Sequence, residues 1–163
     1  MALSTFFRSS LSLDPSANVT LAQEIELQRL YLDIEKVRFP KRLQVSIDVP
    51  DDLADASVPA LILQPLVENA IKYGVSATRD PVLLTIEARR LDGGRMQIEV
   101  VNQLAKAGKT TPAAKPAHLG TGLGLANVCQ RLEAHYGDRA DCRFGPIAGG
   151  YQVSIALPID GDD

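Results

Sequence analysis

The segment 61–74, LILQPLVENAIKYG, constrains the fold most, because its apolar residues follow a helical pattern. They recur at the i, i+3, i+4, i+7, i+8 spacing of one helix face, which predicts a helix that buries this face against a sheet. The residues on the predicted buried face are Leu63, Leu66, Val67, Ala70 and Ile71.

The same segment gathers Glu68, Asn69 and Lys72 within about one helical turn. A carboxylate, an amide and an ammonium are costly to bury, but they suit the surroundings of a metal-bound phosphate. We therefore interpret the helix as one wall of a nucleotide site. The alternative is a solvated helix face, on which a Glu68–Lys72 pair is worth about 0.3 kcal/mol.

Composition indicates one globular domain, because the 163-residue chain is 45% hydrophobic and 23% charged. A net charge of -3 provides no basic field for nucleic acid or an anionic membrane, so we expect neither as a partner. No apolar run approaches the roughly 20 residues of a membrane helix, and we expect a cytoplasmic domain. The two cysteines, Cys129 and Cys142, lack metal-site spacing, which predicts two buried, reduced side chains without a disulfide.

The first predicted helix covers residues 21–38. Thr20 and Gln23 match a capping box, and Pro40 follows the expected end. The helical spacing of Leu27, Leu30, Tyr31, Ile34 and Val37 predicts the core-packing face, with Gln23, Glu24, Gln28 and Glu35 as polar positions.

Strict alternation of apolar residues predicts the strands. It covers residues 42–49, then 82–88 and 96–101 as one hairpin around Asp92-Gly93-Gly94, and finally 142–144 and 151–157 as a second hairpin. A third helix with Leu125 and Leu132 should end at Gly137. This order predicts an α/β two-layer sandwich with a mixed, mostly antiparallel sheet and three main helices on one face.

A long loop leads into the third helix. Residues 104–119 have no periodicity, and they run into Gly120-Thr121-Gly122-Leu123-Gly124-Leu125. Glycines allow close approach of the backbone to a ligand, and a helix N-terminus favours phosphate. By itself the glycine pattern also fits a tight turn, and it matches neither a dinucleotide fingerprint nor a P-loop.

In combination these motifs resemble the GHKL ATPases. Residues 68–74, ENAIKYG, resemble the N box, and residues 120–128, GTGLGLANV, resemble the G2 box. The runs QPLVENA at 64–70, YLDIEKVRF at 31–39 and NVCQRL at 127–132 are similar to LytS/YehU-type sensor histidine kinases. The resemblance covers about residues 20–158 and implies a Bergerat-type ATP-binding fold.

The resemblance assigns roles to individual residues. Asn69 would ligate Mg²⁺, Glu68 would orient groups around the reacting phosphate, and Lys72 and Tyr73 would lie near the nucleotide. The backbone of the glycine turn would hold the phosphates, through Gly120, Thr121, Gly122, Leu123, Gly124 and Leu125. Arg131, further along this helix, is expected to pack or pair with an ion rather than to contact phosphate.

Two departures from the family pattern stand out. Asn102 occupies the position of an Asp that accepts a hydrogen bond from the adenine amino group, and the Gly that follows it in relatives is missing. No phosphoacceptor motif is present, since His118 and His135 lack the family context. We expect residues 1–18 to be a linker or the tail of the missing hairpin, and residues 19–160 to form the ATP-binding domain.

The resemblance implies a protein histidine kinase that uses ATP and Mg²⁺. Its implied partners are a phosphoacceptor hairpin of the same kinase and a response regulator of the LytTR type, and its implied parent is anchored in the inner membrane. Two alternatives remain: a docking module that has lost nucleotide binding, and a protein serine kinase of the anti-sigma type.

Overall fold

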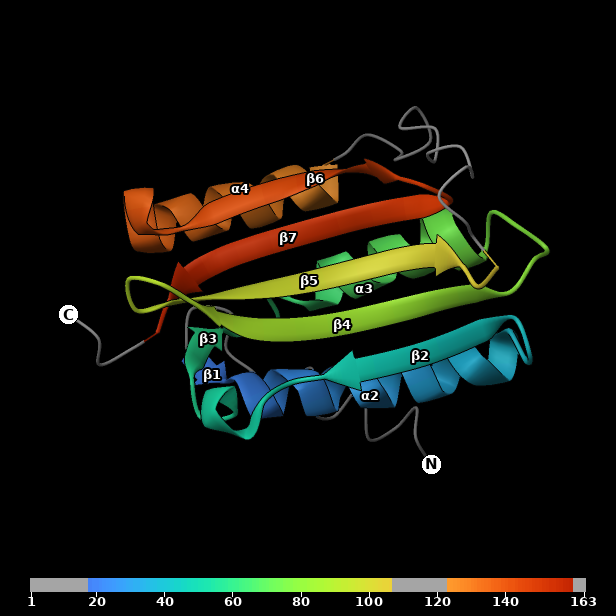
Figure 1. Ribbon diagram of the computed structural model, residues 1–163, viewed down its shortest axis with the longest axis horizontal. Coiled ribbons are helices and arrows are strands. Elements are labelled where there is room, and N and C mark those ends of the chain that lie inside the picture. Colours follow the sequence, from blue (N-terminus) through green and yellow to red (C-terminus); the bar gives the residue numbers. More distant parts are fainter. Residues whose placement is uncertain (1–17, 107–122, 160–163) are drawn as a thin grey trace.

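Alternating apolar residues form the central sheet of the computed structural model, which describes residues 18–106 and 123–159. Within these residues the sheet has five strands in the order β2-β4-β5-β7-β6. β2 pairs with β4 in parallel, and the other neighbours are antiparallel, so the predicted mixed sheet is confirmed (Figure 1). The strand bounds are Leu43–Asp48 for β2, Val82–Leu91 for β4, Arg95–Leu104 for β5, Asp141–Ile147 for β6 and Gly150–Pro158 for β7.

Both predicted hairpins are confirmed. The β4–β5 turn contains Gly93 and Gly94, with φ angles of 79° and 69°, and the β6–β7 turn contains Gly149, with φ of 70°. These left-handed conformations are strained for residues with a Cβ, which explains why the turns contain glycine.

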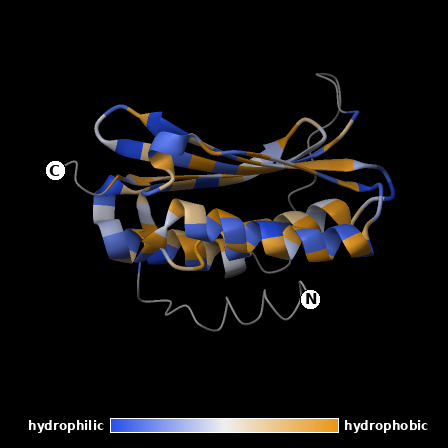
Figure 2. Cartoon of the chain, turned by 90° about the horizontal axis from the view of Figure 1, so that it is seen from below, coloured by the Kyte–Doolittle hydropathy of each residue, from blue (hydrophilic) through white to orange (hydrophobic). Residues whose placement is uncertain are grey.

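Three helices cover one face of the sheet: α2 (Leu21–Arg38), α3 (Gln64–Ala70) and α4 (Leu123–Tyr136). Figure 2 shows the helices as one layer and the sheet as the other, which confirms the two-layer sandwich. The predicted capping box starts α2: the Gln23 N–H donates to Thr20 Oγ1 over 3.1 Å, and the Thr20 N–H donates to Gln23 Oε1 over 2.9 Å. Gly137, with φ of 60°, follows α4 as predicted.

The predicted buried face of α3 is also confirmed. Leu63, Leu66, Val67, Ala70 and Ile71 are each at most 3% exposed. The last turn widens into a π-helix, η2 (Ile71–Val75), and the Ser76 N–H donates to the Ile71 carbonyl over 2.9 Å. π-turns of this kind are frequent at functional sites.

The predicted core-packing face of α2 is wrong in part. Leu27 is buried, but Leu30, Tyr31 and Ile34 are only half-buried, and Val37 is 83% exposed. The buried face contains polar residues instead, because Glu24 and Gln28 hydrogen-bond to residues at the start of α3. The residues of α2 that are buried are Leu21, Glu24, Ile25, Leu27, Gln28, Leu32 and Glu35.

Several short elements were not predicted. β1 (Asn18–Thr20) and β3 (Ser57–Pro59) form a separate antiparallel pair. The 3-10 turns η1 (Asp51–Leu53) and η4 (Gly137–Arg139) follow β2 and α4. Each has three residues, which is too short for a periodic pattern.

The two cysteines form a disulfide, so the prediction of two reduced side chains is wrong. Cys129 on α4 and Cys142 on β6 are 13 residues apart in sequence, and their Cα atoms are 5.5 Å apart. The packing of α4 over the edge strand β6 brings them together, which sequence spacing did not reveal.

Among the described residues, no helix is both long and apolar enough to cross a membrane.

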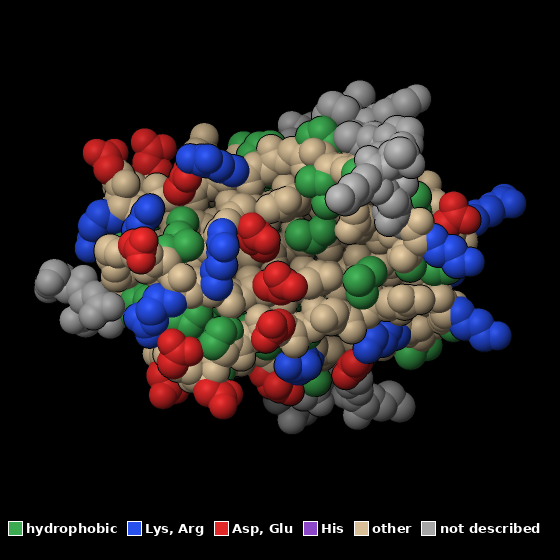
Figure 3. Space-filling model, in the orientation of Figure 1, with side chains coloured by type: hydrophobic (Ala, Val, Ile, Leu, Met, Phe, Trp, Pro, Cys, Tyr) green, Lys and Arg blue, Asp and Glu red, His purple; other side chains and the backbone are tan. Residues whose placement is uncertain are grey.

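The other face of the sheet is open and polar, and Figure 3 shows acidic and basic side chains over it. Asp48, Glu87 and Glu99 are register partners on three neighbouring strands. The Glu99 carboxylate accepts hydrogen bonds from Gln97 Nε2 over 2.9 Å and from Gln152 Nε2 over 3.1 Å. These amide donors offset part of the repulsion between adjacent carboxylates.

Candidate functional site

The start of α3 is held by a carboxylate from α2. Glu24 is fully buried, and its two oxygens accept the backbone N–H of Leu63 over 2.9 Å and that of Leu61 over 3.1 Å. These N–H groups lie at the helix N-terminus, where a negative charge is favourable. Glu24 therefore fixes the position of the helix that carries the predicted site residues.

A second contact fixes the same segment. Arg131 Nη2 donates to the Ala60 carbonyl over 2.5 Å, which agrees with the packing role expected for this arginine. Leu61 lies between the two contacts with φ of 62°, a left-handed conformation that costs a leucine about 1 kcal/mol. The strained backbone is therefore stabilised by Glu24 on one side and Arg131 on the other.

Burial raises the pKa of the Glu24 carboxyl above its ordinary value of 4.5, against the opposing effects of the Leu63 and Leu61 N–H groups and the Arg131 charge. Because the folded pKa is the higher one, the stabilisation that this shift contributes is complete below pH 4.5 and is lost as pH rises through the folded pKa.

We expect this loss to appear as a difference between wild type and Glu24→Gln, which cannot ionise at this position. The free energy of unfolding of the wild type minus that of the variant should fall as pH rises from about 4.5, because only the wild type must bury a charge. Urea unfolding over a pH series measures it. If this difference in free energy rose with pH instead, the hydrogen bonds from the Leu61 and Leu63 N–H groups would stabilise the charged carboxylate more than burial destabilises it.

A chain of amides leads from α2 to Glu68. Gln28, which is fully buried, donates from Nε2 to Gln64 Oε1 over 3.1 Å. Gln64 then donates from Nε2 to Glu68 Oε1 over 2.8 Å. The exposed carboxylate of Glu68 is thus oriented by side chains on its own helix and on α2.

The other predicted residues of α3 and of η2, which continues it, differ in exposure. Asn69 and Tyr73 are half-buried, while Lys72 is exposed. The Lys72 ammonium lies 5.2 Å from the centre of the Tyr73 ring, within cation–π range. Tyr73 belongs to η2 and borders a cavity.

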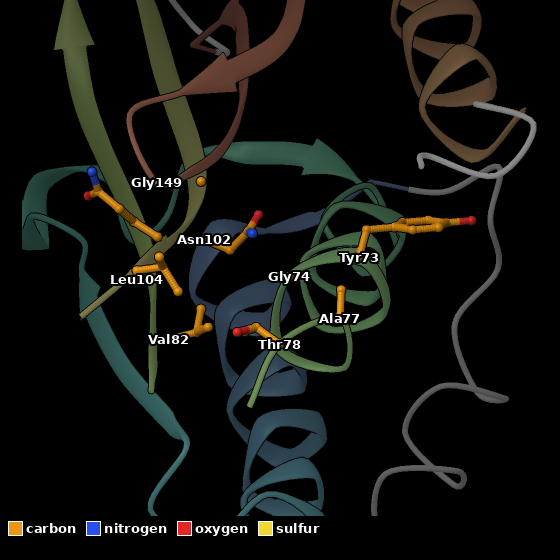
Figure 4. Close-up of a pocket in the computed structure, with 10 residues that line it drawn as sticks. Tyr73, Gly74, Ala77, Thr78, Val82, Asn102, Leu104 and Gly149 are labelled. Atoms are coloured by element: carbon orange, nitrogen blue, oxygen red, sulfur yellow. The ribbon is translucent and has the colours of Figure 1, made fainter. Parts of the chain in front are cut away.

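This cavity has a volume of about 300 Å³, at the lower end of the range for small-molecule sites. Figure 4 shows that its walls come from η2 and the segment after it, from β4 and β5, and from the β6–β7 turn. The lining residues are Tyr73, Gly74, Ala77, Thr78, Val82, Asn102, Gln103, Leu104, Gly149 and Gly150. Two cavities of similar volume, near Phe144 and near the disulfide, contain none of the predicted site residues.

Asn102 is the polar group at the inner wall of this cavity. It continues the inward-facing series of β5, after Met96, Ile98 and Val100, and it is only 8% exposed. No hydrogen bond from residues 18–106 or 123–159 engages its side chain. A side-chain amide that faces a cavity and has no partner among these residues is a candidate for binding a ligand.

Two glycines make room for Asn102. A Cβ added at Gly74 would overlap the Asn102 amide nitrogen and lie 2.7 Å from its Cγ. A Cβ added at Gly150 would overlap the Asn102 carbonyl oxygen and lie 2.7 Å from Gln103 Cα. The absence of a side chain at Gly74 therefore leaves room for the Asn102 amide, and its absence at Gly150 lets β7 pair closely with β5.

The comparisons with known proteins agree with this arrangement. A family model described as "Histidine kinase" matches residues 1–43. The sensor histidine kinase BtsS of Escherichia coli K12 is 45% identical over 136 residues, which are 83% of this chain and 23% of BtsS. The sensor protein LytS of Oceanobacillus iheyensis is 33% identical, over 96% of this chain and 28% of LytS. This is a LytS-type histidine kinase catalytic domain.

Solved structures support the fold of the kinase domain. The catalytic domain of histidine kinase ThkA matches with a TM-score of 0.60 and 18% identity, over 88% of this chain and 95% of that chain. ThkA in complex with the response regulator TrrA matches with a TM-score of 0.59 and 12% identity, over 96% and 47% of the two chains. The chain spans about a quarter of the length of the curated relatives it matches.

The glycine turn of the kinase domain is described only at its end. Gly120, Thr121 and Gly122 lie outside the described residues, and α4 begins at Leu123. Gly124 is exposed, with nothing within 4 Å of an added Cβ, whereas the Leu125 side chain is 3% exposed and belongs to the core. Any ligand contact by Leu125 would therefore come from its backbone.

Sequence reasoning missed part of the site. The motifs assigned no site role to five residues that line the cavity: Ala77, Thr78, Val82, Gly149 and Gly150. The signal for Glu24 and Gln28 was their i, i+4 spacing on one helix face, which the structure buries. Polar residues with helical spacing can thus mark a buried hydrogen-bonding face.

Proposed function

We propose that this kinase domain binds ATP with Mg²⁺ and presents the γ-phosphate to a histidine on a helical hairpin of the same kinase. The proposal rests on the Asn102 amide, which has no partner among the described residues and faces a cavity lined by Gly74 and Gly150. Adenine has an amino group that would donate a hydrogen bond to the Asn102 side-chain oxygen.

The residues of α3 and η2 fit the phosphate end of such a ligand. Asn69 precedes Tyr73 by about one helical turn, and its amide oxygen is a hard donor that would hold Mg²⁺. Lys72 would lie near the phosphates, and Glu68 would orient groups around the metal. When bound, Mg²⁺ neutralises phosphate charge, and the domain contributes mainly placement of the nucleotide.

The glycine turn would complete the site. Backbone N–H groups from Gly120 to Leu125, at the start of α4, would hold the β- and γ-phosphates. We also propose residues 19–160 as the catalytic domain and residues 1–18 as the end of the upstream hairpin. The match of residues 1–43 to the histidine kinase family model supports this continuity.

The wider setting is inferred from relatives. ThkA has been solved with the response regulator TrrA, and we infer a response regulator, of the LytTR type, as the phosphate acceptor downstream of this kinase. The parent protein would be anchored in the inner membrane, with this domain in the cytoplasm.

Titration of the domain with a non-hydrolysable ATP analogue tests the proposal, with and without Mg²⁺. We expect saturable binding that Mg²⁺ strengthens, and at least tenfold weaker Mg²⁺-dependent binding for Asn69→Ala, because a metal ligand is lost. Gln130→Ala removes an exposed amide from α4 and serves as the control. No binding at millimolar nucleotide would favour a docking module instead.

A further inference from the structure

The cavity beside Asn102 contains no charged side chain among its described lining residues. Its polar side chains are Tyr73, Thr78, Asn102 and Gln103. Gln103 is already engaged, since its Nε2 donates to the Ala148 carbonyl over 2.7 Å. Thr78 Oγ1 accepts the Asp80 N–H over 3.1 Å, which leaves the hydroxyl proton able to turn toward a ligand.

Asn102 differs from these residues because no described residue fixes the direction of its amide. A carboxamide has an oxygen that accepts and an NH₂ that donates, and the two ends have nearly the same shape. Turning the group by about 180° therefore exchanges donor and acceptor without changing the space it fills. A carboxylate at the same place could only accept.

Adenine and the 6-oxopurines differ in this pattern at the corresponding edge. Adenine donates from its 6-amino group, whereas guanine and hypoxanthine accept at O6 and donate from N1. Resting on the function proposed above, we propose that the cavity also accepts 6-oxopurine nucleotides, because Asn102 can offer its oxygen to adenine or its NH₂ to O6. Discrimination of purines is then weak, since neither base leaves the amide unpaired.

The test measures the affinities of Mg²⁺ complexes of ATP, GTP and ITP for wild type and Asn102→Asp, with CTP as the control for binding through the triphosphate alone. We expect GTP or ITP to bind wild type within tenfold of ATP, and at least tenfold more tightly than CTP. In Asn102→Asp the preference for ATP over both should rise at least tenfold, because a carboxylate repels O6.

Asn102→Ala provides a second reading if the charged variant does not fold. It removes the amide without adding a charge. The affinity for ATP and the affinity for whichever of GTP and ITP binds more tightly should fall by factors that agree within about threefold. A loss of affinity for ATP alone would overturn the inference.

Other outcomes separate this inference from the function on which it rests. Wild type that binds ATP more than tenfold more tightly than both GTP and ITP would overturn the inference and leave ATP binding intact. An unchanged preference in Asn102→Asp, or CTP binding equal to that of the purines, would also overturn it. Absence of binding by all four nucleotides would contradict the proposed function as well.

Discussion

Replacing Glu24 by Ala is expected to lower the free energy of unfolding by about 3 kcal/mol. The change leaves the N–H groups of Leu61 and Leu63 without their acceptor at the start of α3, and it removes a carboxylate near the Arg131 charge. It also removes a contact that stabilises the left-handed backbone at Leu61. Urea unfolding measures the effect.

Glu26→Ala is the matched control for this variant. Glu26 lies on the same helix, but it is exposed, and its nearest approach to Arg29 is 3.9 Å. An exposed pair of this kind is worth little, so we expect a change below about 0.5 kcal/mol. Equal effects of the two substitutions would show that Glu24 does not hold α3.

Replacing Gly74 by Ala is expected to weaken ATP binding at least tenfold while leaving the domain folded. The added Cβ would overlap the Asn102 amide and force that side chain into the cavity or away from its place. In an ordinary helix the same substitution favours folding by about 1 kcal/mol, so loss of binding would not reflect a weaker helix. Titration with an ATP analogue and thermal unfolding separate the two effects.

Gly145→Ala is the control for Gly74→Ala. Gly145 lies on the edge strand β6, and a Cβ added there meets nothing within 4 Å. Its variant should bind the analogue as wild type does. If Gly74→Ala also bound like wild type, the cavity beside Asn102 would not be the nucleotide site.

The parts of the fold that sequence predicted are those governed by local periodicity. The capping box at Thr20 and the alternation in β4 and β5 depend on residues close in sequence, and both are confirmed. The apolar face of α3 is confirmed for the same reason, because residues three and four apart meet on one helix face.

The candidate site was predicted only in part. Asn69, Lys72 and Tyr73 lie within one motif, and Asn102 was predicted only from the resemblance, as the residue in the position of the family's Asp. Its place on the inner face of β5 comes from the structure. The cavity that joins Tyr73 to Asn102 could not be predicted, because its walls come from elements distant in sequence that only tertiary packing brings together.

Sequence by itself determined the order of the main elements, their two-layer arrangement and the motifs of a LytS-type kinase domain. Only the tertiary structure decided which polar residues are buried and which cysteines meet. Glu24 is buried because its hydrogen-bond donors lie 37 and 39 residues away, and Cys129 meets Cys142 because α4 packs over β6. Interactions between elements depend on packing geometry, which local patterns do not contain.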